Sequence, residues 1–175
     1  MLNIKKANKL LKIAYNEFSS LQDETIFINE DTEFYVQHGF VGDTLERCSI
    51  INIVSELERN KFQSWMSRYI KKEFNIDDNV YMFYNFNEVF AFLHEVGHVY
   101  YKDMQEESLA FYESYKDNEY KSYNEMYLTY RNIPAEKLAD QFASIIIKNQ
   151  YLKIWSLMNE ISEDQAQEEY EFWSM

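Results

Sequence analysis

The sequence predicts an α+β fold that is mostly helical, with a small β-sheet of about three or four strands packed against the helices. The chain has 175 residues, enough to bury a core, and 46% of them are hydrophobic, which excludes a disordered chain. Only three glycines and one proline occur, and so few breakers favour helices over many strands and turns. At this length, residues 1–175 are most simply one domain.

The N-terminal part is expected to start with a helix and continue into strands. Residues 3–21 carry apolar side chains at helical spacing between lysines and polar residues. Short β-branched or aromatic runs then predict strands. These lie at residues 25–28, 34–36 and 49–54, with a turn at Gly39 and Gly42 between the last two.

The central part is expected to return to helix before a further strand. Residues 58–74 repeat large apolar side chains at intervals of three and four, residues 75–79 form a loop, and residues 80–84 are a strand candidate. Asn85 and Glu88 resemble a capping box that starts a helix reaching about Tyr101. Gly97 costs this helix up to about 1 kcal/mol relative to alanine, which suggests that another element packs closely there.

The C-terminal part is expected to be helical. Residues 102–131 are rich in charge, and tyrosines recur among them at helical spacing. Pro134 suits the first turn of a helix that continues through Ile147, because its missing N–H costs nothing there. The acidic segment 162–175 is expected to be a last helix or a docking tail.

The motif His94-Glu95-Val96-Gly97-His98 carries the functional prediction. It reads H-E-x-x-H, and positions i and i+4 of a helix share one face, so both imidazoles can bind one zinc ion. Zinc lowers the pKa of its water toward about 7 and polarises a carbonyl. Glu95 is the expected general base, taking a proton from that water and passing it to the leaving amine.

A third zinc ligand must come from elsewhere in the chain, since catalytic zinc usually has three. Glu136 is the best candidate, because it lies in the first turn of a helix whose other face is apolar. Asp140 lies one turn later and is placed to fix the tautomer of His94. His38, beside Gly39 in the expected turn, is a rival ligand. Less persuasive carboxylates follow the motif: Asp103, Glu106 and Glu107.

A further donor should stabilise the oxyanion formed during peptide hydrolysis. A tyrosine is the expected donor, because His38 is the only histidine outside the motif. Eight tyrosines lie between His98 and Glu136, and the sequence does not select among them. They are Tyr100, Tyr101, Tyr112, Tyr115, Tyr120, Tyr123, Tyr127 and Tyr130.

Two segments together resemble the ImmA/IrrE family of zinc metallopeptidases. Residues 90–98 contain the H-E-x-x-H motif, and residues 136–143 match the family pattern E-x-x-A-(D/N)-x-F-A. The resemblance covers these two segments only. It implies a zincin-like fold, zinc ligands at His94, His98 and Glu136, Glu95 as general base and Asp140 behind a ligand. It also implies cleavage of a helix-turn-helix repressor of a phage or mobile element.

Charge and cysteine content suggest the compartment and the partners. The formal net charge of −13 argues against direct nucleic-acid binding but suits a basic protein partner, such as a DNA-binding repressor. Cys48, the only cysteine, is expected to be a buried apolar residue, and its being alone fits a reducing cytoplasm. The chain start carries no signal-like apolar region, and no run is long enough to cross a bilayer, so no membrane association is expected.

The alternative to an enzyme is a protein that only binds its partner. A compact acidic chain could bind rather than cut, by imitating the charge of DNA or by inhibiting a host defence protein, with a structural zinc site. The oligomeric state and the identity of any substrate are not predicted by the sequence.

Overall fold

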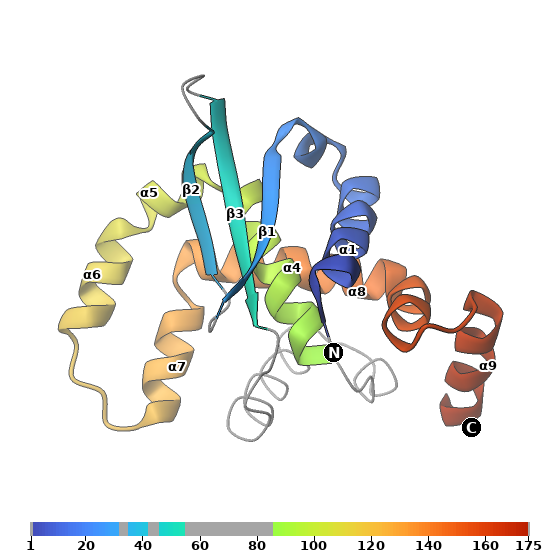
Figure 1. Ribbon diagram of the computed structural model, residues 1–175. Coiled ribbons are helices and arrows are strands. Elements are labelled where there is room, and N and C mark those ends of the chain that lie inside the picture. Colours follow the sequence, from blue (N-terminus) through green and yellow to red (C-terminus); the bar gives the residue numbers. More distant parts are fainter. Residues whose placement is uncertain (1, 32–34, 42–45, 55–85, 175) are drawn as a thin grey trace.

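The computed structural model describes residues 2–31, 35–41, 46–54 and 86–174. Within these residues the chain is mostly helical and contains a three-stranded mixed sheet, which confirms the α+β prediction. Figure 1 shows helix α4 lying against the sheet and helix α8 crossing behind it. The predicted helix 58–74, loop 75–79 and strand 80–84 lie outside the described residues.

The sheet has the strand order β1-β3-β2. Strand β1 (Thr25–Asp31) pairs in parallel with β3 (Glu46–Val54), and β2 (Tyr35–Val41) pairs antiparallel with β3. The strands are longer than predicted at 25–28, 34–36 and 49–54. The predicted turn at Gly39 is wrong, because the ladder with β3 continues through Gly39, which pairs with Cys48. Gly42 lies outside the described residues.

The N-terminal helix packs its apolar stripe into the core. Helix α1 (Ile4–Glu17) begins at Asn3, whose side chain accepts a hydrogen bond from the Lys6 backbone N–H. It ends four residues earlier than predicted, because Ser19–Asp23 turn into a 3-10 helix. Several apolar side chains of this region and the sheet join one core: Ala7, Leu10, Leu11, Ala14, Leu21, Ile51 and Ile53. Cys48 is buried, as predicted.

Helices α4 (Phe86–Tyr100) and α8 (Pro134–Asn159) pack against each other more extensively than any other helix pair of the described residues. A Cβ added at Gly97 would lie 2.8 Å from the Ala139 Cα and 3.1 Å from its carbonyl oxygen. The glycine is therefore needed for close approach, as its place in the motif suggested. Pro134 opens α8 as predicted, and the helix is interrupted near Gln150, which has non-helical dihedral angles.

The predicted capping box at the start of α4 lies partly outside the described residues. Asn85 lies outside them, and the buried carboxylate of Glu88 accepts a hydrogen bond of 2.6 Å from the Leu2 backbone N–H. Glu88 therefore ties the N-terminal segment to α4, across a separation of 86 residues.

Three short helices connect α4 to α8 and are called the arm here. They are α5 (Asp103–Glu107), α6 (Leu109–Asp117) and α7 (Tyr123–Arg131). The arm projects from the sheet and the α4–α8 pair on the side opposite to the C-terminal helix α9 (Glu163–Ser174) (Figure 1). None of the helices described is both long enough and apolar enough to cross a membrane.

Candidate metal centre

Helix α4 supplies both histidines of the motif from one buried face. Leu93 and Val96 are fully buried around them and fix the rotation of the helix. The Nε2 atoms of His94 and His98 lie 3.0 Å apart, and both side chains are buried. Two donor atoms on successive turns thus face the same point, as the i, i+4 spacing requires.

Helix α8 brings Glu136 to the same point. Its Oε2 atom lies 3.2 Å from the His94 Nε2, and its Oε1 atom lies 3.5 Å from the His98 Nε2. The side chain is only 2% exposed. The ligand-type atoms of these three residues all lie within 4.8 Å of one another, the only such histidine, cysteine and carboxylate group among the residues described. They can therefore hold a metal ion.

The geometry and the hydrogen bonding both fit a bound cation. Ligand atoms at about 2.0–2.1 Å from a tetrahedral zinc ion lie roughly 3.3 Å apart, close to the separations seen here. The buried Glu136 Oε2 has no hydrogen-bond partner among the described groups, an arrangement that a cation would relieve. Burial acts to raise the pKa of this carboxyl, but interaction with His94 and His98 outweighs it and lowers the pKa far below its usual value.

Asp140 holds the far side of the His94 ring. Its Oδ1 atom lies 2.8 Å from the His94 Nδ1, so a proton on Nδ1 is shared with the carboxylate and Nε2 is left free to bind a metal. Burial acts to lower the pKa of His94, but its contacts with Asp140 and Glu136 raise it to about 9. A proton therefore competes with a metal for this site, and metal binding should release it.

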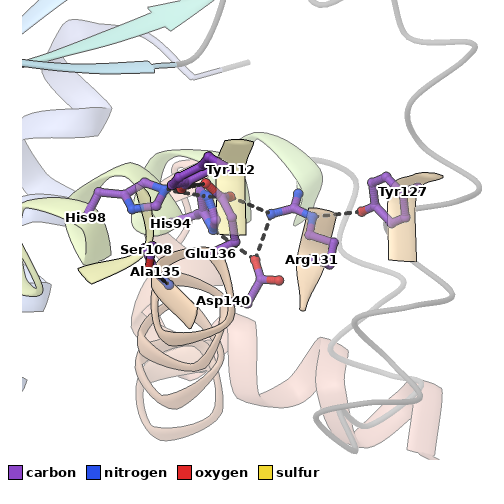
Figure 2. A network of polar contacts seen from close by, with 9 residues as sticks. All are labelled: His94, His98, Ser108, Tyr112, Tyr127, Arg131, Ala135, Glu136 and Asp140. Atoms are coloured by element: carbon purple, nitrogen blue, oxygen red, sulfur yellow. Dashed lines mark hydrogen bonds and ion pairs between the residues drawn. The ribbon is translucent and has the colours of Figure 1, made fainter. Parts of the chain in front are cut away.

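Arg131, at the end of α7, was not predicted from the sequence. Its Nη1 atom lies 3.0 Å from the Asp140 Oδ1 and 3.8 Å from the Glu136 Oε2, and its Nε donates to the Tyr127 hydroxyl at 3.2 Å. Figure 2 shows this chain of contacts running from the imidazoles through Asp140 and Arg131 to Tyr127. The buried guanidinium thus balances part of the negative charge around the site.

The buried charges leave room for a divalent cation. Glu95, Glu136 and Asp140 contribute three carboxylates and Arg131 one guanidinium, so the formal balance is two negative charges when both imidazoles are neutral. Glu95 is buried beside the ligands, and burial raises the pKa of its carboxyl. A raised carboxyl pKa suits a group that takes up and returns a proton near neutral pH.

Two of the eight predicted tyrosines reach the site. The Tyr112 hydroxyl donates to the Glu136 Oε1 at 2.5 Å, and the Tyr130 hydroxyl also interacts with this carboxylate. Five others make contacts that do not involve the three ligand-type residues. Tyr100 and Tyr101 pack on the Phe142 ring, the Tyr120 hydroxyl donates to the Tyr115 carbonyl oxygen and the two rings pack at a tilt, and Tyr127 contacts Arg131. Tyr123 is largely exposed.

The rival ligands are not part of the three-residue group. His38 lies in strand β2, not in a turn, and its Nδ1 atom is 3.0 Å from the Ser49 Oγ. Asp103, Glu106 and Glu107 are exposed on α5. The structure therefore brings together His94, His98 and Glu136, and Asp140 contacts the far nitrogen of His94. The rival ligands lie outside this three-residue group.

No family model, curated protein or solved structure matches the chain. The site is consequently interpreted from its own geometry.

Proposed function

We propose that this protein is a zinc-dependent endopeptidase that cleaves a specific protein. The observation that carries the proposal is the buried convergence of His94, His98 and Glu136, within 4.8 Å of one another. Two imidazoles and a carboxylate are the ligands that hydrolytic zinc commonly uses with an open fourth position. The glutamate inside the motif adds a proton acceptor next to them.

A zinc ion bound there would act as a Lewis acid toward water and the scissile carbonyl. Glu95 accepts the proton of the attacking water and later gives it to the leaving amine. Its buried surroundings keep its pKa above the ordinary value, which allows both transfers. Asp140 keeps the Nδ1 of His94 protonated, and Arg131 holds Asp140 in place.

The proposed substrate is a basic protein, and a DNA-binding repressor is the specific candidate. The net charge of −13 gives the chain a negative field that attracts cationic surfaces and speeds encounter. The resemblance of residues 90–98 and 136–143 to the ImmA/IrrE segments points to the same substrate class.

The test compares the zinc-loaded protein with its Glu95→Gln variant on a pool of peptides from a digested bacterial proteome. New peptide termini are identified by mass spectrometry, and the fastest cleaved peptide is used for rates. We expect Glu95→Gln to lower kcat about 10²–10⁴-fold while zinc stays at one per chain. The matched control is Glu107→Gln, which removes an exposed carboxylate of α5 and should leave the rate unchanged.

Equal cleavage by the wild type and Glu95→Gln, or no cleavage by either, would contradict the proposal. Retained binding of a basic protein by Glu95→Gln, combined with no hydrolysis by the wild type, would instead support an acidic binding protein.

A further inference from the structure

We propose that Tyr112 is a catalytic residue that donates a hydrogen bond to the oxygen of the scissile carbonyl. This inference rests on the proposed peptidase function and selects one tyrosine from the eight in the segment between the histidines and Glu136.

The first support is the position of the hydroxyl. It lies 2.5 Å from the Glu136 Oε1, and the same oxygen is 3.5 Å from the His98 Nε2. The other oxygen, Oε2, faces His94 and Arg131. In Figure 2, Tyr112 accordingly lies on the imidazole side of Glu136, whereas Arg131 approaches from the other side. The hydroxyl is thus beside the place where a reacting carbonyl would meet the three ligand groups.

The second support separates Tyr112 from Tyr130, which also interacts with Glu136. The Tyr112 hydroxyl makes a direct hydrogen bond of 2.5 Å to Oε1, the oxygen that faces His98. The Tyr130 ring instead packs against the rings of Tyr112 and Tyr115, with centroids 6.3 and 5.4 Å away, and lies 5.9 Å from the Arg131 guanidinium carbon. Tyr112 is therefore on the side of Glu136 that faces the imidazoles, and Tyr130 is beside Arg131.

The third support is the element that carries the residue. Tyr112 belongs to α6 of the arm, a helix without a fully buried side chain, and is itself only partly buried. Part of the Tyr112 side chain is therefore open to solvent. Arg131 is a less suitable donor than Tyr112, because its guanidinium is buried and already contacts Asp140 and Tyr127.

The chemistry of the step is balanced. A water oxygen forms a bond to the carbonyl carbon, and the π-electron pair of the C=O moves to the carbonyl oxygen. Glu95 takes the water proton. The electron pair on the oxygen then re-forms the C=O as the C–N bond breaks, the C–N pair stays on the nitrogen, and Glu95 gives that nitrogen the proton, so the products are a carboxylic acid and an amine. The Tyr112 hydroxyl exchanges its bond with Glu136 for one to the oxygen that becomes negative, and it keeps its proton. Such a donor stabilises the tetrahedral stage more than the substrate.

The test uses Tyr112→Phe in the full chain, with Tyr130→Phe as the matched control. Both remove one hydroxyl that interacts with Glu136, so a merely structural role predicts similar effects. For the peptide identified in the proteome digest, we expect Tyr112→Phe to lower kcat about 10²–10³-fold with KM within about threefold. Tyr130→Phe should lower kcat less than about tenfold. Both variants should keep one zinc per chain and the far-ultraviolet circular dichroism of the wild type.

A second measurement reports on the tetrahedral stage directly. A phosphinic analogue of the same peptide imitates that stage, and Tyr112→Phe should weaken its inhibition by the same factor as kcat. Equal losses for the two variants, a loss confined to KM, or loss of zinc from Tyr112→Phe would overturn the assignment of Tyr112 while the peptidase function stands. Absence of wild-type cleavage would overturn both.

Discussion

The α4–α8 pair and the arm both contribute to the site, but they are held in place differently. The facing surfaces of α4 and α8 are filled with buried side chains, and Gly97 brings the two backbones into contact. In the arm, α5 and α6 contain no buried residue, and Leu109 and Phe111 are more than half exposed. The proposed metal ligands are therefore all on the packed pair, and the additional donors come from the arm.

This division has a physical reason. Metal ligands must converge within a few tenths of an ångström, which needs side chains on rigid, densely packed elements. A donor that changes partner during a reaction needs some freedom, and segments with few buried contacts open at a low free energy cost. The Ser108 hydroxyl, which accepts a hydrogen bond from the Ala135 backbone N–H at 3.0 Å, ties the arm to the start of α8.

Replacing Arg131 should have one of the largest effects on stability, because this residue joins the two regions. Arg131→Met leaves the buried Asp140 with His94 as its remaining cationic partner and removes the contacts of the guanidinium with Glu136 and Tyr127, so we expect a loss of about 3–5 kcal/mol in the free energy of unfolding. The measurement is urea denaturation of the metal-free protein, since bound metal would add its own stabilisation. Lys116→Met, which removes an exposed cation of the arm, is the control.

The expected change for Lys116→Met is within about 0.5 kcal/mol. If Arg131→Met were equally mild, the arm would be attached by its apolar contacts and not by the buried ion pair.

Gly97→Ala tests the packed pair and should have an intermediate effect. The new Cβ would meet the backbone of Ala139 at 2.8 Å, which a rotamer change cannot relieve, so the helices must separate. We expect a net loss of about 1–3 kcal/mol in the free energy of unfolding. Zinc affinity should fall as well, because Glu136 moves away from the imidazoles. Denaturation and zinc titration check the two effects.

The intrinsic preference of helices for alanine over glycine acts in the opposite direction. Ala91→Gly, at a partly buried position of α4, measures that preference, about 1 kcal/mol, in the same helix. If the Gly97→Ala protein were more stable than the wild type, α4 and α8 would have room for the added methyl group. The close contact between Gly97 and the Ala139 backbone would then not be what requires a glycine here.

The sequence predicted those parts of the site that depend on local periodicity. Two histidines at i and i+4, and Glu136 with Asp140 at the start of a second helix, follow from helical geometry and from the chemistry of the residues. Arg131 and the choice of Tyr112 depend on the path of the arm in space, which periodicity does not contain. A signal for Arg131 did exist, because an Asp140 buried on an apolar helix needs a cation nearby.

The predictions that were wrong also concern features that local sequence patterns do not determine. Gly39 was predicted to lie in a turn, since glycine commonly interrupts strands, but the pairing of β2 with β3 extends through it and places His38 in the sheet. Tertiary pairing overrode the local preference there. The predicted end of α1 at residue 21 was also wrong, since the helix ends at Glu17 and a 3-10 helix follows.

The smallest expected effect is that of Phe111→Ala in the arm. Phe111 is 53% exposed on α6, and Phe142 in α8 is 0% exposed, although both are phenylalanines in helices near the site. Phe142→Ala should cost about 3–5 kcal/mol, because it leaves a cavity beneath Tyr100 and Tyr101. Phe111→Ala loses little buried area, so we expect a change of at most about 0.5 kcal/mol in the free energy of unfolding. A loss for Phe111→Ala approaching that of the Phe142 variant would mean that the arm is packed as firmly as the α4–α8 pair, and the freedom required of Tyr112 would then be lacking.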